Sequence, residues 1–234
     1  MADHWKETAK GILSHHFLLG ELEPSVLDQL LDYGHYRVFP RGEVIFQKGD
    51  PGDSLLAVIF GKIRISTVSA DGQEVVLNVL GAGDVFGEIA FLDGKDRTAD
   101  ASALEETGLL MLRRSSFYPF VKANPDVAMR LLEILCERLR WVSDNYEDVI
   151  FLDLPARLAK RLLRLADRFG KPAEEGVRVN IKLSQQELGH MTGVTREAVN
   201  KVLRKWEEQG FVSIERAALT IRERDRLELI ATSH

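Results

Sequence analysis

The most informative segment of this chain of 234 residues reads Phe86-Gly87-Glu88-Ile89-Ala90-Phe91-Leu92-Asp93-Gly94-Lys95-Asp96-Arg97-Thr98-Ala99. Gly87 permits a close approach of the backbone, and residues 88–90 can form a single helical turn whose free N–H groups point at an anion. Arg97 adds a permanent positive charge on a planar fork that suits phosphate oxygens, and the Thr98 hydroxyl can donate another hydrogen bond. The Glu88 carboxylate would repel a free phosphate but can accept a hydrogen bond from a sugar hydroxyl. The segment therefore predicts a sugar-phosphate site, with a structural ion pair between Glu88 and Arg97 as the alternative.

Short runs of β-forming residues surround this segment, and turns rich in glycine separate them. The clearest runs are residues 43–46, 55–60, 62–67 and 74–80. Many short strands at about ten-residue spacing predict an antiparallel β-roll or barrel that continues to about Arg113. Before the roll, apolar positions at helical spacing in residues 5–33 predict two or three short helices.

A long amphipathic helix is predicted for residues 124–152. Its apolar positions lie alternately four and three residues apart and form a stripe of heptad type. Ile134 and Trp141 widen the stripe on an adjacent face. A helix with two apolar faces can pack on its own domain with one and on a twin helix with the other, which predicts a homodimer; a helix buried within a monomer is the alternative. The stripe comprises Ala128, Leu132, Leu135, Leu139, Val142, Tyr146 and Val149.

Residues 153–234 predict a second domain with a helix-turn-helix. Pro155 disfavours helix at Leu154, so a hinge is expected there, before an amphipathic helix from Ala156 to about Phe169. Further on, Ser184 and Glu187 have the spacing of a capping box. The remaining signals are a glycine turn at Gly193, a second helix cap at Thr195, a buried helix face (Val199, Val202, Leu203 and Trp206) and an outward polar face (Arg196, Glu197, Asn200 and Lys201).

A helix with long polar side chains in its first turns can enter the major groove of DNA and reach base edges. Arg or Lys suits guanine, and Glu can accept from a cytosine amino group. Lys182, Arg204 and Lys205 are better assigned to phosphates, which fix register without reading sequence. After this helix, residues 212–216 and 218–222 predict a wing hairpin, and residues 224–230 an additional terminal helix.

The charge of the chain is divided unevenly along its length. The formal net charge is −5, yet residues 153–234 hold 16 Lys and Arg against 12 Asp and Glu, or +4, and the first 152 residues carry −9. An acidic effector domain joined to a polyanion-binding domain would show this asymmetry. The composition, 45% hydrophobic and 29% charged, is that of a globular protein, and no apolar run approaches the roughly 20 residues that span a bilayer. We therefore expect a cytoplasmic location.

The single cysteine, Cys136, excludes an internal disulfide and cannot by itself hold a thiolate zinc or iron–sulfur site. It is expected to be a small buried hydrophobic residue on the long helix. No metal-ligand cluster, and no nucleophile paired with a base, stands out in the sequence, so an enzyme is the weakest of the functional alternatives.

The first half resembles the cyclic-nucleotide-binding domain, whose phosphate cassette reads Gly-Glu-hydrophobic-Ala, a short loop, and Arg-Ser/Thr-Ala. The matching residues are Gly87, Glu88, Ile89, Ala90, Arg97, Thr98 and Ala99. The resemblance implies that Arg97 binds the exocyclic phosphate with help from Thr98 and the backbone of residues 87–89, and that Glu88 holds the ribose 2′-hydroxyl. The predicted nucleotide-binding residues are Phe86, Gly87, Glu88, Ile89, Ala90, Arg97, Thr98, Ala99, Arg138, Val142, Ser143 and Asn145.

The same resemblance bears on which nucleotide is bound. In adenosine-selective relatives the long helix supplies a Thr-Ser pair to the base, and Val142-Ser143 stands at the aligned positions. In domains that accept guanosine, a Thr after the phosphate Arg often contacts the guanine amino group, and Thr98 is that residue. Arg138 resembles the family's helix arginine near the pocket, with a solvated surface charge as the alternative. Cyclic AMP is therefore expected first, with cyclic GMP as a competitor.

The second half closely resembles the Crp-Fnr winged helix-turn-helix, on residues 183–189, 195–201 and 210–212. With the cassette, long helix and hinge in the family's order, the resemblance covers about residues 15–225. It implies an α+β protein of three parts: a cyclic-nucleotide-binding antiparallel β-roll with short N-terminal helices (1–123), a dimerisation helix (124–152) and a winged helix-turn-helix domain (153–234).

The resemblance also implies a function, which is regulation of transcription without enzymatic activity. A homodimer would bind a palindromic operator in double-stranded DNA, with RNA polymerase as a further partner and no metal, haem or iron–sulfur cluster. The residues predicted to contact base edges are Arg196, Glu197 and Lys201. Lys201 stands where the family usually has Arg. The other predicted DNA contacts are Lys182, Ser184, Thr195, Asn200 and Lys205. The alternatives are a regulator that acts without ligand and keeps a vestigial pocket, and a nucleotide-binding regulatory module of another assembly, such as a kinase or channel.

Overall fold

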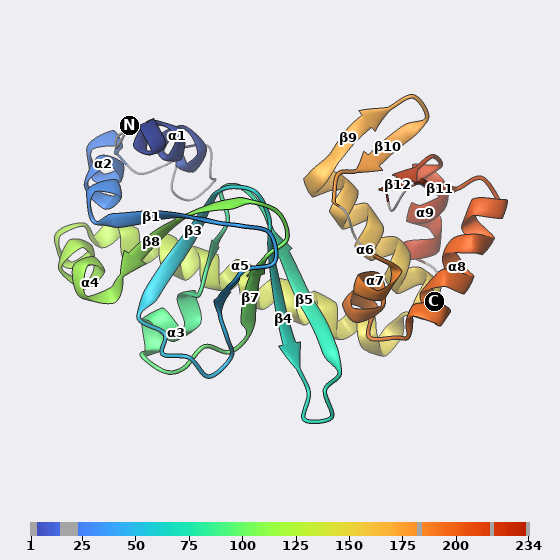
Figure 1. The fold of residues 1–234 in the computed structure, drawn as a ribbon, viewed down its shortest axis with the longest axis horizontal. Helices are drawn as coiled ribbons and strands as arrows, with labels where there is room; N and C mark the ends of the chain where they lie inside the picture. The colour runs from blue at the N-terminus through green and yellow to red at the C-terminus, as the bar shows by residue number, and fades with distance from the viewer. Residues whose placement is uncertain (1–3, 15–22, 182–183, 216–217, 233–234) are drawn as a thin grey trace. The chain divides into compact units, whose positions relative to one another are not determined.

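The computed structural model describes residues 4–14, 23–181, 184–215 and 218–232. The contacts divide the chain into two compact units, Met1–Leu139 and Arg140–His234. Helix α5 (Pro125–Phe151) contributes its first half to the first unit and its last turns to the second (Figure 1). Antiparallel sheets, a long helix and a C-terminal helix-turn-helix make this the α+β architecture that the sequence predicts. In the described part of the chain, none of the helices combines the length and apolar character needed to cross a bilayer.

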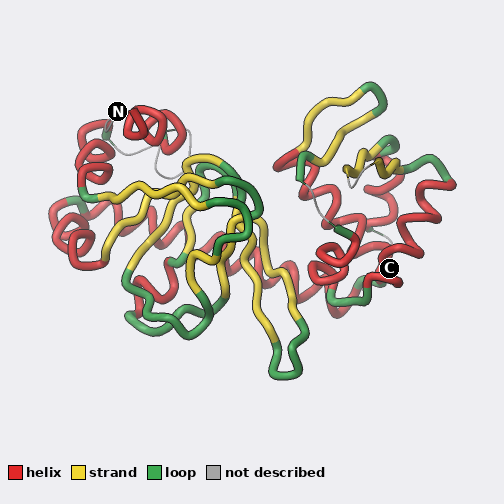
Figure 2. Tube along the Cα trace, in the orientation of Figure 1, coloured by secondary structure: helices red, strands yellow, loops and turns green. Residues whose placement is uncertain are grey.

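The first unit contains a roll of two four-stranded antiparallel sheets. One sheet has the order β1 (Gly34–Phe39), β8 (Thr107–Arg113), β3 (Ser54–Phe60) and β6 (Val85–Phe86). The other has the order β2 (Val44–Phe46), β7 (Asp100–Ala103), β4 (Ile63–Val68) and β5 (Glu74–Leu80). Figure 2 shows the strands of the roll in yellow and the loops that join them in green.

Alternate residues of β3 enter two different hydrophobic clusters because successive side chains of a strand point to opposite faces. Leu56 and Val58 pack with Phe39, Ile63 and other residues between the two sheets. Leu55, Ala57 and Ile59 of β3 pack on the opposite face, against the helices. Both faces of this strand are covered, so its sequence lacks the polar alternation of a half-exposed strand.

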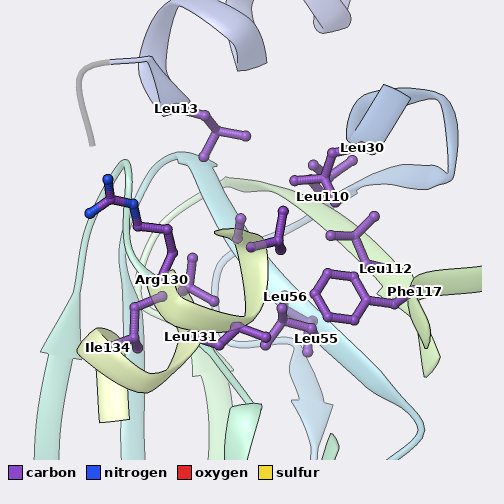
Figure 3. A pocket seen from close by; sticks show the side chains of 13 residues that line it. Leu13, Leu30, Leu55, Leu56, Leu110, Leu112, Phe117, Arg130, Leu131 and Ile134 are labelled. Carbon is purple, nitrogen blue, oxygen red and sulfur yellow. The ribbon is translucent and has the colours of Figure 1, made fainter. Parts of the chain in front are cut away.

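The helices of the first unit cover that opposite face. They are α1 (His4–Leu13), α2 (Pro24–Asp32), α4 (Arg114–Ala123) and the first half of α5, while the short helix α3 (Glu88–Asp93) follows β6. Figure 3 shows Leu131 and Ile134 of α5 facing Leu110 and Leu112 of β8 and Phe117 of α4. An apolar cavity of about 30 Å³ remains between them.

The second unit is a winged helix-turn-helix. Its sheet has the order β11 (Val212–Glu215), β12 (Ala218–Ile221), β10 (Gly176–Val179) and β9 (Gly170–Ala173). Its helices are α6 (Leu154–Phe169), α7 (Gln185–Thr192), α8 (Arg196–Glu208) and α9 (Arg224–Ala231). The buried face of α6, which includes Leu158 and Leu162, contributes to the core of this unit.

The helix expected from Ala156 begins two residues earlier, at Leu154. The side chain of Asp153 accepts a hydrogen bond from the backbone N–H of Ala156 at 2.9 Å and so caps the helix. Pro155 is tolerated because a residue in the first turn has no intrahelical acceptor for an N–H to reach. The proline therefore stands at the start of α6 rather than before it.

The expectation for Cys136 is wrong. Cys136 is exposed on α5, whereas Val127, Leu131 and Ile134 of the same helix are buried against the roll. These three residues lie three or four apart and define one narrow face, and Cys136 falls outside it.

We predict that Leu131→Ala lowers the free energy of unfolding by about 2–5 kcal/mol, because it removes buried methyl groups and enlarges an existing apolar cavity. Urea unfolding followed by circular dichroism measures the change. Met129→Ala is the matched control, since Met129 lies on the same helix with 58% of its surface exposed; its effect should stay within about 0.5 kcal/mol. Equal losses in the two variants would contradict the packing of α5 on the roll.

Candidate functional site

Arg97 lies between α3 and β7 with only 4% of its surface exposed. Its Nη1 donates a hydrogen bond to the carbonyl of Gly87 at 2.9 Å. Its Nη2 donates to the carbonyl and the hydroxyl of Ser54 at 2.8 and 2.9 Å. The guanidinium carbon lies 4.3 Å from the centroid of the Phe46 ring. The Nε–H is also buried, but it has no acceptor among the described residues. The side chain is thus held firmly, and two of its five N–H donors, the Nε–H and one on Nη1, are left by the described residues for a further acceptor.

Burial lowers the pKa of Arg97, and the carboxylates of Asp53, Glu88 and Asp50 act in the opposite direction. An arginine nevertheless stays protonated in proteins, so a full positive charge lies in this interior. A buried charge is costly unless it is paired and fully hydrogen-bonded. The site therefore favours an anion that can accept from the remaining donors of Arg97.

Gly87 is the N-cap of α3 and has a φ of 77°, in the left-handed region that favours glycine. A Cβ at this position would lie 2.5 Å from Nη1 of Arg97 and 3.2 Å from Cδ1 of Leu56. The glycine thus permits both the sharp turn into α3 and the close approach of the arginine. The first N–H groups of α3 have no intrahelical acceptors, so this turn supplies further donors to an anion.

Glu88 and Arg138 lie together beside this turn. Glu88 is 4% exposed, and its Oε1 lies 3.4 Å from Nε of Arg138 on α5. Nη2 of Arg138 also donates to the carbonyl of Val85 at 3.4 Å. The structure therefore brings Arg138 to the cassette, where the sequence predicts it. The carboxylate keeps lone pairs for a hydroxyl donor, since a carboxylate can accept several hydrogen bonds.

The other predicted residues of the cassette divide by burial. Phe86, Ala90 and Ala99 are buried and contribute packing. Ile89 and Thr98 are exposed and can reach a ligand.

The predicted base contacts on α5 belong to the second unit. Val142 and Ser143 are exposed there. The side-chain amide of Asn145 donates to the carbonyl of Trp141 at 2.6 Å, and its oxygen accepts from Nη1 of Arg164 on α6 at 3.0 Å. Asn145 therefore joins α5 to α6, and its role toward a base stays a prediction, as do those of Val142 and Ser143.

Ser54 and Phe46 are site residues that the sequence does not reveal. Ser54 lies 43 residues before Arg97 and holds it through two oxygens. Phe46 lies on β2 and contacts the guanidinium with its ring. Nothing in the local pattern distinguishes this serine or this phenylalanine from other strand residues.

The helix-turn-helix has both of its predicted caps. The hydroxyl of Ser184 accepts from the backbone N–H of Glu187 at 3.2 Å, and the Glu187 carboxylate accepts from the Ser184 backbone at 2.6 Å. Thr195 caps α8 by accepting from the N–H of Ala198 at 3.3 Å. Between the helices, Gly193 has a φ of 70°. The two helices therefore begin and turn where the sequence predicts.

The outer face of α8 presents the predicted DNA-binding side chains. Val199, Leu203 and Trp206 are buried on the inner face, while Val202 is only partly buried. Lys182 lies outside the described residues. Of the predicted set on α8, Arg196, Glu197, Lys201 and Lys205 are exposed and Asn200 is half-buried.

Two family matches agree with these two units. Residues 36–124 match the cyclic nucleotide-binding domain, and residues 156–230 match the Crp-like helix-turn-helix domain. The two domains in this order define a class: transcription regulators that join a cyclic-nucleotide-binding roll to a DNA-binding domain.

Similar proteins span almost the whole chain. A CRP-like cAMP-activated global transcriptional regulator of Mycobacterium tuberculosis is 35% identical over 216 residues, which cover 92% of this chain and 96% of that protein. The cyclic AMP receptor protein of Thermus thermophilus is 34% identical over 210 residues, which cover 90% of this chain and 94% of that protein. The chain belongs to the family of CRP-like transcription regulators.

Solved structures agree in fold. The Thermus thermophilus catabolite activator protein is 34% identical, with a TM-score of 0.54. The match covers 92% of this chain and 97% of that chain. FixK2 of Bradyrhizobium japonicum is 22% identical, with a TM-score of 0.76. The match covers 86% of this chain and 98% of that chain. The likeness to FixK2 concerns the fold alone.

We predict that Gly87→Ala destabilises the protein more than Gly72→Ala, as measured by urea unfolding. Both glycines have a positive φ, so alanine costs about 1–2 kcal/mol at either position. A Cβ at Gly72 meets nothing within 4 Å, whereas one at Gly87 meets Arg97 at 2.5 Å. The difference between the two variants thus measures the crowding at the arginine. Equal losses would contradict the packing described here.

Proposed function

We propose that this chain is a homodimeric, cyclic-nucleotide-responsive transcription regulator that binds duplex DNA. The observation that carries the ligand site is the buried guanidinium of Arg97, whose Nε–H has no acceptor among the described residues. A cyclic phosphate would supply that acceptor and the compensating negative charge. The turn at Gly87 would direct the first N–H groups of α3 at the same phosphate.

The ribose is assigned to Glu88. Its carboxylate is buried beside the turn that would bind the phosphate, and a hydroxyl is the donor that suits it. Arg138 lies 3.4 Å from this carboxylate and pairs with it. The pair would thus hold the sugar at a fixed distance from the phosphate.

Cyclic AMP is the proposed nucleotide, with cyclic GMP as the competitor. The names of two similar proteins, those of Mycobacterium tuberculosis and Thermus thermophilus, state a response to cAMP or its binding. Thr98 is exposed next to Arg97 and has the hydroxyl that a guanine amino group would meet. Val142 offers no hydroxyl to an adenine, so Ser143 is left as the residue of that pair that can hydrogen-bond to the base.

DNA recognition is assigned to the outer face of α8. Arg196, Glu197 and Lys201 would read base edges in the major groove, and Asn200 lies on the same part of the helix. Lys205, Ser184, Thr195 and Lys182 are assigned to the phosphate backbone. The hydroxyls of Ser184 and Thr195 accept from helix N–H groups and still have a proton to donate to a phosphate.

The dimer is assigned to α5, which has a second apolar face. Buried residues of this helix pack on its own roll, but several members of the predicted stripe are left exposed, from 49% to 68% of their surface: Leu132, Leu139, Val142, Tyr146 and Val149. A second α5 would cover this face as in a coiled coil. A two-fold dimer would read a palindromic operator, and RNA polymerase is the further partner proposed.

One observation favours a ligand-independent regulator as the second candidate. Nη1 and Nη2 of Arg97 already have protein acceptors at Gly87 and Ser54. Such a regulator would bind its operator with the same affinity whether or not a cyclic nucleotide is present.

We predict that Arg97→Ala weakens cAMP binding by at least about a hundredfold, since it removes charged donors to the phosphate. Calorimetric titration of the full-length protein with cAMP, and with cGMP in parallel, gives both affinities. Arg41→Ala is the control, because Arg41 is an exposed arginine in the turn between β1 and β2. Undiminished affinity in the Arg97 variant would exclude the proposed phosphate site.

We predict that Glu197→Ala changes the preferred operator sequence, while Lys205→Ala weakens binding to all sequences alike. A base contact carries sequence information, whereas a phosphate contact adds to the salt dependence by about one unit of slope. Selection from random duplexes and titrations at several salt concentrations measure the two effects. The assignment of α8 fails if the Glu197 variant selects the same sequences as the wild type.

A further inference from the structure

Helix α4 holds the C-terminal end of α3, the short helix that begins at the phosphate turn. The carbonyl of Leu92, in the last turn of α3, accepts from Nη2 of Arg114 at 3.2 Å and from the hydroxyl of Tyr118 at 3.1 Å. Nη2 of Arg114 also donates to the Tyr118 hydroxyl at 3.2 Å, and its guanidinium carbon lies 5.1 Å from the ring centroid. These three groups form a closed hydrogen-bonded triangle at the end of α3.

Gly94 makes room for this triangle. It is the C-cap of α3, with a φ of 74°, and its N–H donates to the carbonyl of Ala90 at 2.9 Å. A Cβ here would lie 2.2 Å from Nη1 of Arg114, so a larger residue would displace the guanidinium. The carbonyls at a helix C-terminus carry partial negative charge, so a cation there stabilises the helix.

The main chain of Arg114 reaches the other side of the same site. Its N–H donates to the carbonyl of Asp53 at 2.8 Å. Asp53 precedes Ser54, whose two oxygens accept from Arg97. The first residue of α4 therefore contacts both of the segments that hold the Arg97 guanidinium, by its backbone at Asp53, next to Ser54, and by its side chain at the end of α3.

We infer that Arg114 and Tyr118 are positioning residues for the bound phosphate. A helix of six residues has too few internal hydrogen bonds to keep its own geometry, so its orientation depends on the contacts of its two ends. Phe117 supports the same alignment, since its ring packs edge-on against Phe91 at 5.1 Å. The inference rests on the proposed function, because both residues act through α3 on the nucleotide.

The test compares Arg114→Gln and Tyr118→Phe with Arg113→Gln in the full-length protein. The first removes the guanidinium and the second removes only the hydroxyl, while Arg113 is an exposed arginine one residue earlier. Calorimetric titration with cAMP should give an affinity about three- to tenfold weaker in the first two variants and unchanged in the control.

Hydrogen exchange of the ligand-free proteins separates positioning from general instability. The amides of residues 88–93 should exchange faster in both variants, while those of β3 and β8 keep the wild-type rates. Unchanged affinity in both variants, weaker binding without faster exchange in α3, or faster exchange throughout the roll would each overturn this inference alone. If the wild type bound neither cAMP nor cGMP, the proposed function would fail and this inference with it.

Discussion

The buried positive charge of Arg97 is the constraint on which the site depends. Desolvating a guanidinium costs free energy, which the surrounding groups offset only in part, through the carbonyls of Gly87 and Ser54 and the ring of Phe46. Each of these groups requires a particular local structure: a left-handed glycine, the first residue of β3 and a residue on β2. An anion that completes the compensation would therefore be recognised by an arrangement already present without it.

This arrangement also connects the ligand site to the long helix. Arg138 is the link, because it pairs with Glu88 beside the phosphate turn and lies on α5. A sugar hydroxyl that bound Glu88 would compete with Arg138 for the carboxylate and so change the strength of that ion pair. A ligand can shift a conformational equilibrium only by binding one state more tightly, and this contact is a place where such a difference can arise. By reciprocity, DNA that favoured the same state would raise the affinity for the nucleotide.

The winged domain could be predicted in more detail than the pocket because its signals are local. Ser184 and Thr195 cap helices through backbone groups three residues away, so their roles are visible in the sequence. The acceptors of Arg97 at Ser54 come together with it only through the pairing of strands far apart in the chain. Helix α4 was not expected from the sequence, because Pro119 disfavours a helix. Tertiary packing of its buried residues overrides this local preference. Strand β9 also contains a proline, Pro172, which an edge strand tolerates.

The two faces of α5 would allow one helix to serve both the proposed ligand and a second subunit. Arg138 turns toward the cassette, while its neighbour Leu139 is 65% exposed on the face proposed for the dimer. Successive residues of an α-helix leave the helix axis about 100° apart, so a rotation of the helix carries both side chains with it. A rotation of α5 that improved the contact between Arg138 and an occupied site would turn Leu139 by the same angle. In the proposed dimer, the helix would thus convert a change at the ribose into a change at the dimer contact, without any need for a separate chain of intermediate residues.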